Sequence, residues 1–537
     1  MNKIQTLASL ALLQLPAAVS AQDALPGVFS EVIDVRVVNV EVVVEDKDGL
    51  RVQGLGPEDF VLMVDGQEVP VEFFSEIRGG AVVAREAGSG PQGLPSLEPG
   101  QPVGTSYLVF IDDFFPISAD RDRVLDRLRE QAGQLGPADR MAVVAYDGKV
   151  LTMLTSWTGN QATIDRAFTE AQRRPAKGLE RRVEKQTMER NRGISALGTG
   201  GFHNGLGVIE REYARVLAEQ VGRVVDAATA TLRSFAMPPG RKVMMLLSGG
   251  WPLDPTVYTI GNTGGLPTSE PGVPSGNELL QPLVDTANRI GYTLYPVDVP
   301  GLSRQTSVDV SQTEPRTAFL DTEEQELHAA LHFAARETGG KSFLNALRGD
   351  ALNRVAEDVR SYYWLGFSPS GKRDDERHEI EVRTSRPGLR IRSRDDYVDY
   401  SRSQEVTAML ESSLLFGSGP ATGALPVELG KPAKGRRNQM EVPIAVAIPV
   451  DGLTFLAAGG GWVAKAELRV GALDSNGQTA DVSVLPIELK SATAPKPGGY
   501  VRYDTRVSLR RLEHRLVLSI YDPLSDKLFS STVSVKP

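Results

Sequence analysis

The sequence predicts an α/β doubly wound domain combined with all-β flanking domains, the last of which is a C-terminal β-sandwich. Between residues 106 and 345, short apolar runs alternate with amphipathic stretches, which is typical of parallel strands joined by helical crossovers. On either side of this stretch, β-branched residues recur at alternate positions, as in antiparallel strands. The chain has 537 residues, of which 41% are hydrophobic and 24% charged, so it is long enough for about three domains with ordinary cores.

The first 21 residues have the features of an export signal. Lys3 supplies the positive charge, and an apolar stretch runs from Leu7 to Val19. Small residues precede Gln22, so we expect signal peptidase to cleave before it; a retained anchor is the alternative. No other apolar run reaches about 18 residues. We therefore expect a periplasmic or secreted protein without an integral membrane segment after cleavage.

Composition argues against several functions. The chain has no cysteine, so it forms no disulfides, no thiolate metal site and no cysteine nucleophile. Its net charge of −9 argues against a general nucleic-acid binder, which needs a basic face.

The N-terminal segment, residues 30–84, is expected to be all-β. Asp46, Asp48 and Asp65 lie at turn signals, and no loop there ends in the bidentate Glu of a calcium loop, so we interpret them as turn residues. Strands are expected at 33–45, 60–63 and 69–74. A stretch rich in Gly and Pro, residues 86–105, follows as a linker.

The α/β unit spans residues 106–345 and contains an insertion at 173–205. The insertion carries eight basic and three acidic side chains between Arg173 and Arg192. A solvated, partly helical segment is the simpler interpretation, and a docking surface for an acidic partner is the alternative. Within the unit, strands are expected at 107–112, 141–146, 150–154, 243–247 and 292–299, and helices at 120–135, 160–172, 207–236, 277–289 and 322–337.

Strand patterns return after the last of these helices. The segment 359–400 resembles residues 31–84 in composition. It could therefore complete the N-terminal sheet, with the α/β unit inserted between the two segments. Residues 417–437 are expected to be a second linker, and residues 438–537 a β-sandwich. The six sandwich strands are expected at 441–450, 464–473, 482–489, 500–509, 516–521 and 527–535.

The most informative strand is the first of the α/β unit. An apolar run from Tyr107 to Ile111 leads directly into Asp112 and Asp113, as in a strand buried on both faces. Open α/β sheets bind their ligands at the carboxyl ends of their strands, so the two carboxylates mark a candidate site.

These features resemble the von Willebrand factor A-type family, and in particular its exported bacterial (acidobacterial-type) subgroup. The resemblance covers about residues 30–400 and depends on the order and spacing of several short fragments. These are Val35–Val44, Pro57–Phe60, Val64–Gln67, Phe110–Asp113, Gly136–Val144, Glu337–Gly340 and Tyr363–Pro369.

The resemblance implies a divalent-cation site that is degenerate in this chain. In the family, Asp-x-Ser-x-Ser, a Thr and a second Asp bind the cation; Asp112 matches the first Asp, but Phe114 and Pro116 stand at the serine positions. Ser248 stands where the later Asp is expected, and Asp113 is a further candidate ligand. We therefore expect no cofactor, with Mg²⁺ or Ca²⁺ at Asp112, Asp113 and Ser248 as the alternative, and a structural hydrogen bond from Ser248 or backbone amides to Asp112. For the Thr ligand, the candidates are Thr155, Thr158 and Thr199.

Aromatic residues gather at the same predicted edge of the sheet. Phe114, Phe115 and Trp251 could provide a contact surface for a protein partner of unknown identity, or they could close the core. Catalytic patterns are missing: Ser248 is not in a Gly-x-Ser-x-Gly elbow, and His328 and His332 lack the Glu of a zinc hydrolase.

We therefore expect an exported, non-enzymatic interaction or adhesion protein. An envelope scaffold or assembly factor that acts through the C-terminal β-sandwich is the alternative, and a hydrolase acting near Ser248 is a third hypothesis.

Overall fold

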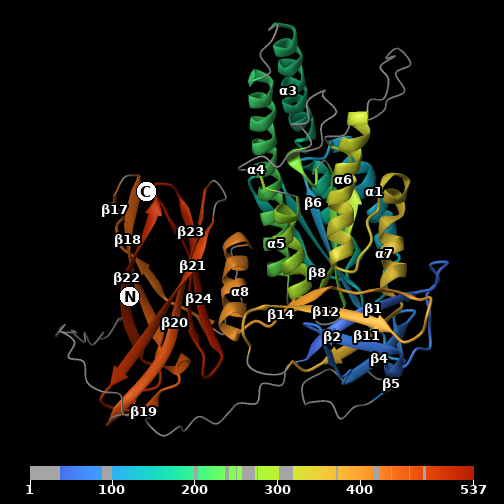
Figure 1. The fold of residues 1–537 in the computed structure, drawn as a ribbon. Coiled ribbons are helices and arrows are strands. Elements are labelled where there is room, and N and C mark those ends of the chain that lie inside the picture. Colours follow the sequence, from blue (N-terminus) through green and yellow to red (C-terminus); the bar gives the residue numbers. More distant parts are fainter. Residues whose placement is uncertain are drawn as a thin grey trace. The chain divides into compact units, whose positions relative to one another are not determined.

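The computed structural model is a mixed α/β protein with one mainly parallel sheet and several antiparallel sheets, some of them C-terminal (Figure 1). The predicted signal peptide and Thr199 lie outside the described residues. No described helix is both long and apolar enough to cross a membrane. The structure describes residues 37–86, 100–198, 204–235, 241–249, 251–256, 273–274, 276–301, 318–369, 373–416, 423–436, 438–458, 460–475 and 479–537.

The central sheet has five strands in the order β10-β9-β6-β7-β8, and only β8 runs antiparallel to its neighbour. Strand β6 lies in the middle, and all eight of its residues are buried, as its continuous apolar run predicts. The strands are β6 (Thr105–Asp112), β7 (Arg140–Tyr146), β8 (Leu151–Thr158), β9 (Arg241–Ser248) and β10 (Tyr292–Asp298).

Helices cover both faces of this sheet, and alternate residues of β6 contribute to the two cores. Leu108 and Phe110 pack with α4 (Asn204–Ser234), α5 (Gly276–Arg289) and α6 (Ala318–Glu337). Tyr107, Val109 and Ile111 pack on the other face with α1 (Ser118–Ala132), α2 (Gln161–Arg173) and α7 (Ala351–Val359), the last of which follows the 3₁₀ helix η3 (Asn345–Asp350).

The predicted insertion forms a long helix, α3 (Gly178–Gly198), which packs against α4 (Figure 1). Its Met188 side chain is buried in the same core as Phe110. The helical part of the prediction is confirmed, and most of the described side chains of α3 are exposed, as in a solvated segment, while Met188 attaches the helix to the sheet domain.

Two antiparallel sheets combine segments that precede and follow the α/β unit in the sequence. One has the order β13-β1-β11-β4-β5, the other β14-β12-β2-β3, and side chains from both share one core. The earlier segment contributes β1 (Val38–Glu45), η1 (Pro57–Asp59), β2 (Phe60–Val64), β3 (Gln67–Val69), β4 (Phe73–Arg78) and β5 (Ala81–Glu86). The later one contributes β11 (Tyr362–Phe367), β12 (Arg377–Thr384), β13 (Arg390–Arg392) and β14 (Asp396–Val398).

The C-terminal part consists of helix α8 (Arg402–Phe416), which was not predicted from the sequence, and two sheets with a common core that are antiparallel except for the short parallel pair of β15 with β24. The predicted linker 417–437 is wrong in part, because β15 (Gly423–Ala424), β16 (Val427–Leu429) and β17 (Ala433–Lys434) pair with the sheets. The remaining elements are β18 (Gln439–Pro449), η4 (Val450–Gly452), β19 (Leu456–Ala458), β20 (Gly461–Asp474), β21 (Thr479–Ser491), β22 (Tyr500–Arg510), β23 (His514–Asp522) and β24 (Lys527–Val535).

Candidate functional site

Asp112 ends β6 at the carboxyl edge of the central sheet, and its side chain is completely buried. Its Oδ1 accepts hydrogen bonds from the backbone amides of Phe114 (2.8 Å) and Phe115 (3.3 Å). Its Oδ2 accepts from Trp251 Nε1 (3.1 Å) and from the hydroxyl of Ser248. The expected structural hydrogen bonds from Ser248 and from backbone amides are thus confirmed, and Trp251 adds a further donor.

The electrostatics of Asp112 follow from this enclosure. Burial raises the pKa of its carboxyl group to about 6, although the hydrogen bonds from Ser248, Phe114 and Trp251 act in the opposite direction. All four donors are neutral groups of the chain itself. The carboxylate therefore has its acceptor positions filled without a cation.

Asp113 turns away from Asp112 and is held by two arginines. Its Oδ1 accepts from Arg121 Nη1 (2.6 Å) and its Oδ2 from Arg174 Nε (2.8 Å). The Asp113 and Arg121 side chains are almost completely buried. Arg121 also donates to Asp122 and to the backbone carbonyl of Arg174. Positive charge already surrounds Asp113, so this carboxylate is not positioned to bind a metal ion.

The predicted cation ligands do not fit a metal site. A hard cation needs several oxygen lone pairs directed at one point, but Ser248 directs its proton at Asp112, and Asp113 is bound to guanidinium groups. Thr155 and Thr158 lie on strand β8 and bond locally, to Ser156 and Asn160. Within the described ranges, no group of three or more His, Asp or Glu side chains is arranged to hold a metal ion.

The three aromatic residues are not an exposed contact surface. The exposed fractions are 5% for Phe114, 0% for Phe115 and 1% for Trp251, so the alternative, in which they close the core, describes their position. The two phenylalanine rings pack edge to face, with centroids 5.1 Å apart. The prediction of partner contact through these rings is corrected, because their side chains do not reach the surface.

Residues 174–182, which we call the capping segment, cross the carboxyl edge of the sheet. The amide of Lys177 donates to the carbonyl of Asp113 (2.7 Å), and the amide of Gly178 donates to the carbonyl of Pro116 (3.0 Å). The guanidinium of Arg181 stacks on the Phe114 ring, 4.5 Å from its centroid. The chain thus covers the edge where a ligand was expected.

The basic side chains of the capping segment are largely used within the chain. Besides Arg174, Lys177 Nζ donates to the carbonyl of Asp147 (2.7 Å), and Arg182 Nη2 donates to the carbonyl of Gly301 (3.2 Å). Arg181 pairs with Glu184 (2.9 Å). These bonds reduce the charge that this part of the insertion offers to an acidic partner.

Gly178 allows the capping segment to approach the sheet edge closely. A Cβ atom there would lie 2.3 Å from the carbonyl oxygen of Pro116 and 2.4 Å from that of Phe115. Both contacts are with backbone, which cannot move aside as a flexible side chain can.

The two remaining catalytic candidates lack a suitable arrangement. Ser248 is fully buried and its hydroxyl is engaged with Asp112, so a substrate has no direct access to it. His332 bonds through Nδ1 to the hydroxyl of Ser342 (2.7 Å) rather than sharing a metal site with His328.

Three residues of the site, Arg121, Arg174 and Gly178, were not predicted from the sequence. A signal was present for Arg121: it lies three residues before Val124 and four before Leu125, so in the helix expected at 120–135 it falls on the same face as these apolar residues. A charged residue at such a position predicts a buried ion pair. No comparable pattern marked Arg174 or Gly178.

No model of a known protein family matches the chain, and no curated protein matches it. The solved structures described next match with low TM-scores. An X-ray structure of a structural genomics target has 13% identity and a TM-score of 0.13, covering 21% of this chain and 83% of that one. A Bacteroides uniformis β-glucuronidase has 9% identity and a TM-score of 0.15, covering 33% of this chain and 19% of the enzyme.

A Streptomyces venezuelae β-glucosidase, solved with D-glucose, has 11% identity and a TM-score of 0.13, covering 59% of this chain and 35% of the enzyme. This chain therefore spans only a minor part of either glycosidase. At these TM-scores the similarities give no indication of its function.

Proposed function

We propose that this chain is an exported, non-enzymatic protein-interaction protein. In this proposal the α/β unit is a doubly wound A-type domain with a degenerate metal site, and the C-terminal part is a β-sandwich. Export is inferred from the pattern of residues 1–21.

The observation that carries the proposal is the environment of Asp112. The A-type resemblance implies that the carboxylate at the end of the first strand binds the cation. Here its two oxygens accept four hydrogen bonds from the chain. This supports an A-type fold that persists without a cation.

The capping segment supports a second part of the proposal. With this segment over the sheet edge, a partner has to contact the chain elsewhere. The burial of Ser248 disfavours the hydrolase hypothesis, because a nucleophile has to reach its substrate.

Cation titration tests the metal part of the proposal. We expect Mg²⁺, Mn²⁺ and Ca²⁺ to leave the Tm of the wild type unchanged in thermal-shift measurements and to give no binding heat in calorimetry. Asp112→Asn is the matched variant, since it keeps the shape of the side chain and removes its charge. A cation that raises the Tm of the wild type, but not that of Asp112→Asn, would show that the site binds metal.

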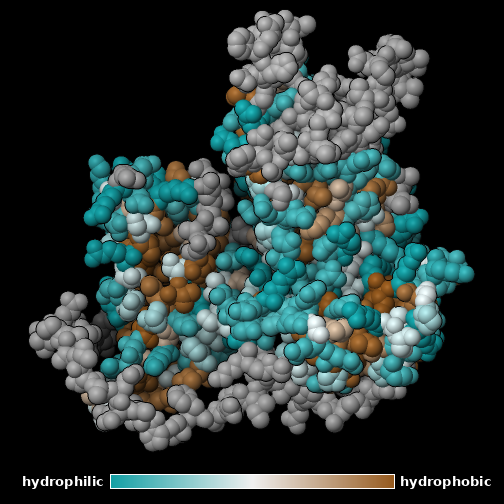
Figure 2. Space-filling model, viewed as in Figure 1, coloured by the Kyte–Doolittle hydropathy of each residue, from teal (hydrophilic) through white to brown (hydrophobic). Residues whose placement is uncertain are grey.

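One observation favours the scaffold alternative. Strand β21 pairs with β20 only, among the residues that the structure describes, so one edge of this 13-residue strand is free. Val484 and Leu485 on it are 41% and 39% exposed, and Figure 2 shows apolar surface over the C-terminal strands. Replacing both residues with lysine should convert any self-associated protein to monomer in sedimentation velocity; an unchanged distribution would count against assembly through this edge.

A further inference from the structure

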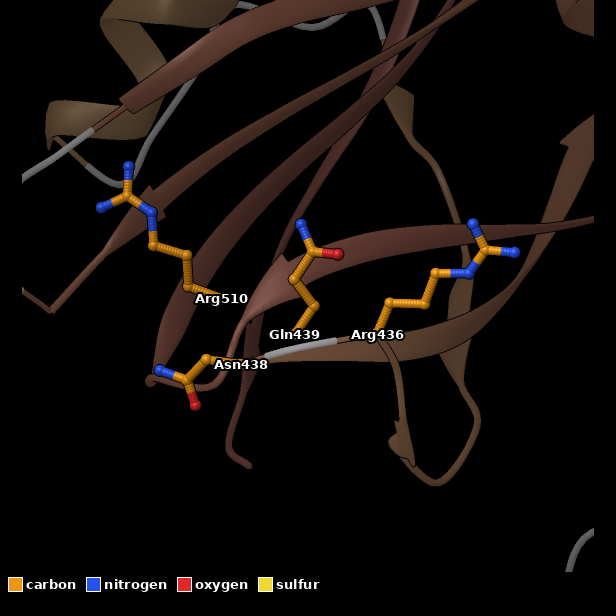
Figure 3. Close-up of a pocket in the computed structure, with 4 residues that line it drawn as sticks. All are labelled: Arg436, Asn438, Gln439 and Arg510. Carbon is orange, nitrogen blue, oxygen red and sulfur yellow. The ribbon is translucent and has the colours of Figure 1, made fainter.

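A pocket lined by two arginines and two amide side chains lies at one end of the C-terminal sheet that contains β18 and β22. It has a volume of about 510 Å³ and opens to solvent, because all four lining residues are exposed. Figure 3 shows the side chain of Gln439 between those of Arg510 and Arg436. The lining residues are Arg436, Asn438, Gln439 and Arg510.

Backbone pairing and backbone hydrogen bonds build this pocket. Gln439 at the start of β18 is paired with Arg510 at the end of β22. The turn that precedes Gln439 is closed by the bond from the Gly435 amide to the Gln439 carbonyl (3.0 Å). The amide of Arg511 donates to the carbonyl of Asn438 (3.0 Å), which ties the turn to the neighbouring strand.

The lining carries two guanidinium groups and two side-chain amides, and no carboxylate is among the lining residues that the structure describes. An ion pair orients one of the two arginines. Arg510 Nη1 lies 3.2 Å from Asp474 Oδ2, and the side chain of Asp474 is 2% exposed. Arg436 forms no ion pair with any residue that the structure describes. The pocket therefore contains one positioned guanidinium group and one that is available, in a chain whose net charge is −9.

We propose that this pocket binds an oxyanion of a small ligand: a carboxylate, sulfate or phosphate group. The planar guanidinium group presents donors in a fork that matches the oxygens of these anions. The amides of Asn438 and Gln439 add neutral donors and acceptors for the rest of the ligand. This site is independent of Asp112 and of the function proposed above.

Calorimetry on the full chain with inorganic phosphate, sulfate and citrate tests this proposal. We expect at least one of the three to bind at low salt, and the relative affinities to identify the preferred oxyanion. Arg436→Gln should raise its Kd about tenfold, the effect of losing one charge-assisted hydrogen bond. Arg510→Gln should have a similar effect, but it also removes an ion pair of the buried Asp474, so Arg436→Gln is the decisive variant.

Arg502→Gln is the matched control. Arg502 lies on β22 with its side chain 48% exposed and paired with Asp504, and it is eight residues from Arg510, or about 26 Å along the strand. Its substitution should change the Kd by less than twofold. The proposal is wrong if none of the three anions binds. It is also wrong if Arg502→Gln and Arg436→Gln weaken binding equally, because equal effects indicate non-specific attraction of anions to exposed arginines.

Discussion

The hydroxyl of Ser248 donates a hydrogen bond to Asp112 Oδ2 between two adjacent parallel strands, β9 and β6. In the A-type domain that we propose for this unit, both positions would be expected to supply oxygen ligands to one cation. Here one group is the donor and the other the acceptor. The hydroxyl of Ser248 thus stabilises the buried carboxylate of Asp112, as a bound metal ion would.

Ser248→Ala should lower the free energy of unfolding by about 1–3 kcal/mol, because it removes one donor from a buried carboxylate. Urea unfolding at neutral pH measures the effect. The same substitution made in an Asp112→Asn background should cost less, because the acceptor charge is already absent. Equal costs in the two backgrounds would contradict a direct coupling between the two side chains.

The capping segment should depend on the absence of a side chain at residue 178. Gly178→Ala should lower the free energy of unfolding by about 1–3 kcal/mol, since its Cβ atom would overlap the carbonyl oxygens of Phe115 and Pro116. Hydrogen exchange should also become faster at the amide of Lys177, which bonds to Asp113.

Gly222→Ala is the control for this substitution. Gly222 lies inside α4, and a Cβ atom there meets nothing within 4 Å. This variant should be neutral or more stable by up to about 1 kcal/mol, from helix propensity. If Gly178→Ala behaves like Gly222→Ala, the capping segment is not held close to the sheet edge.

The strands around the site could be predicted because each depends on a local pattern. The unbroken apolar run of β6 and its two carboxylates gave both the strand and the position of Asp112. Helix α8 was missed although its buried side chains Val406, Leu410 and Leu414 recur every four residues, because only this short stripe marks it.

What occupies the site depends on contacts between segments far apart in sequence. The donor role of Trp251 and the bond from Arg174 to Asp113 join residues 139 and 61 positions apart. Composition indicated an arginine-rich insertion, but it did not indicate which part of the folded domain the insertion covers. The sequence therefore predicted the absence of serine ligands, whereas the capping segment could be found only in the structure.

Asp358 joins the N-terminal β segment to the α/β unit. Its carboxylate bonds to Arg51 and Arg392 of the β segments and to the hydroxyl of Tyr295 on β10 (2.7 Å). Burial acts to raise its pKa, but Arg392, Arg51 and Lys341 outweigh burial and hold the pKa well below its usual range.

Asp358→Asn should lower the free energy of unfolding by about 3–5 kcal/mol at pH 7, because the largely buried Arg392 loses its ion pair with Asp358, whereas Arg51 keeps its pair with Glu45. A depressed carboxyl pKa contributes stability above the unfolded pKa, about 3.9, and this contribution is lost as the pH falls. The difference between wild type and variant should therefore shrink under acidic conditions in urea titrations. A difference that is independent of pH would show that the carboxylate charge is not responsible.

His378 should make the stability of the β segments depend on pH in the opposite direction. Its Nδ1 lies 2.8 Å from Asp65 Oδ2 and its Nε2 3.3 Å from Asp374 Oδ1. Burial acts to lower the pKa of the imidazole, but the bonds to Asp65 and Asp374 outweigh it and raise the pKa above its ordinary value. A raised histidine pKa contributes stability that is complete below the unfolded pKa, about 6.5, and is lost as the pH rises through the folded value.

His378→Gln should therefore be less stable than wild type at pH 5.5, by up to about 1 kcal/mol because the site is partly solvated. This difference should decrease toward pH 8. Urea unfolding across this range measures it, and NMR titration of the ring gives the folded pKa directly. His332→Gln is the control, because burial and His328 lower the pKa of His332, and its pH dependence should have the opposite sign. A folded pKa for His378 below 6.5 would contradict the prediction.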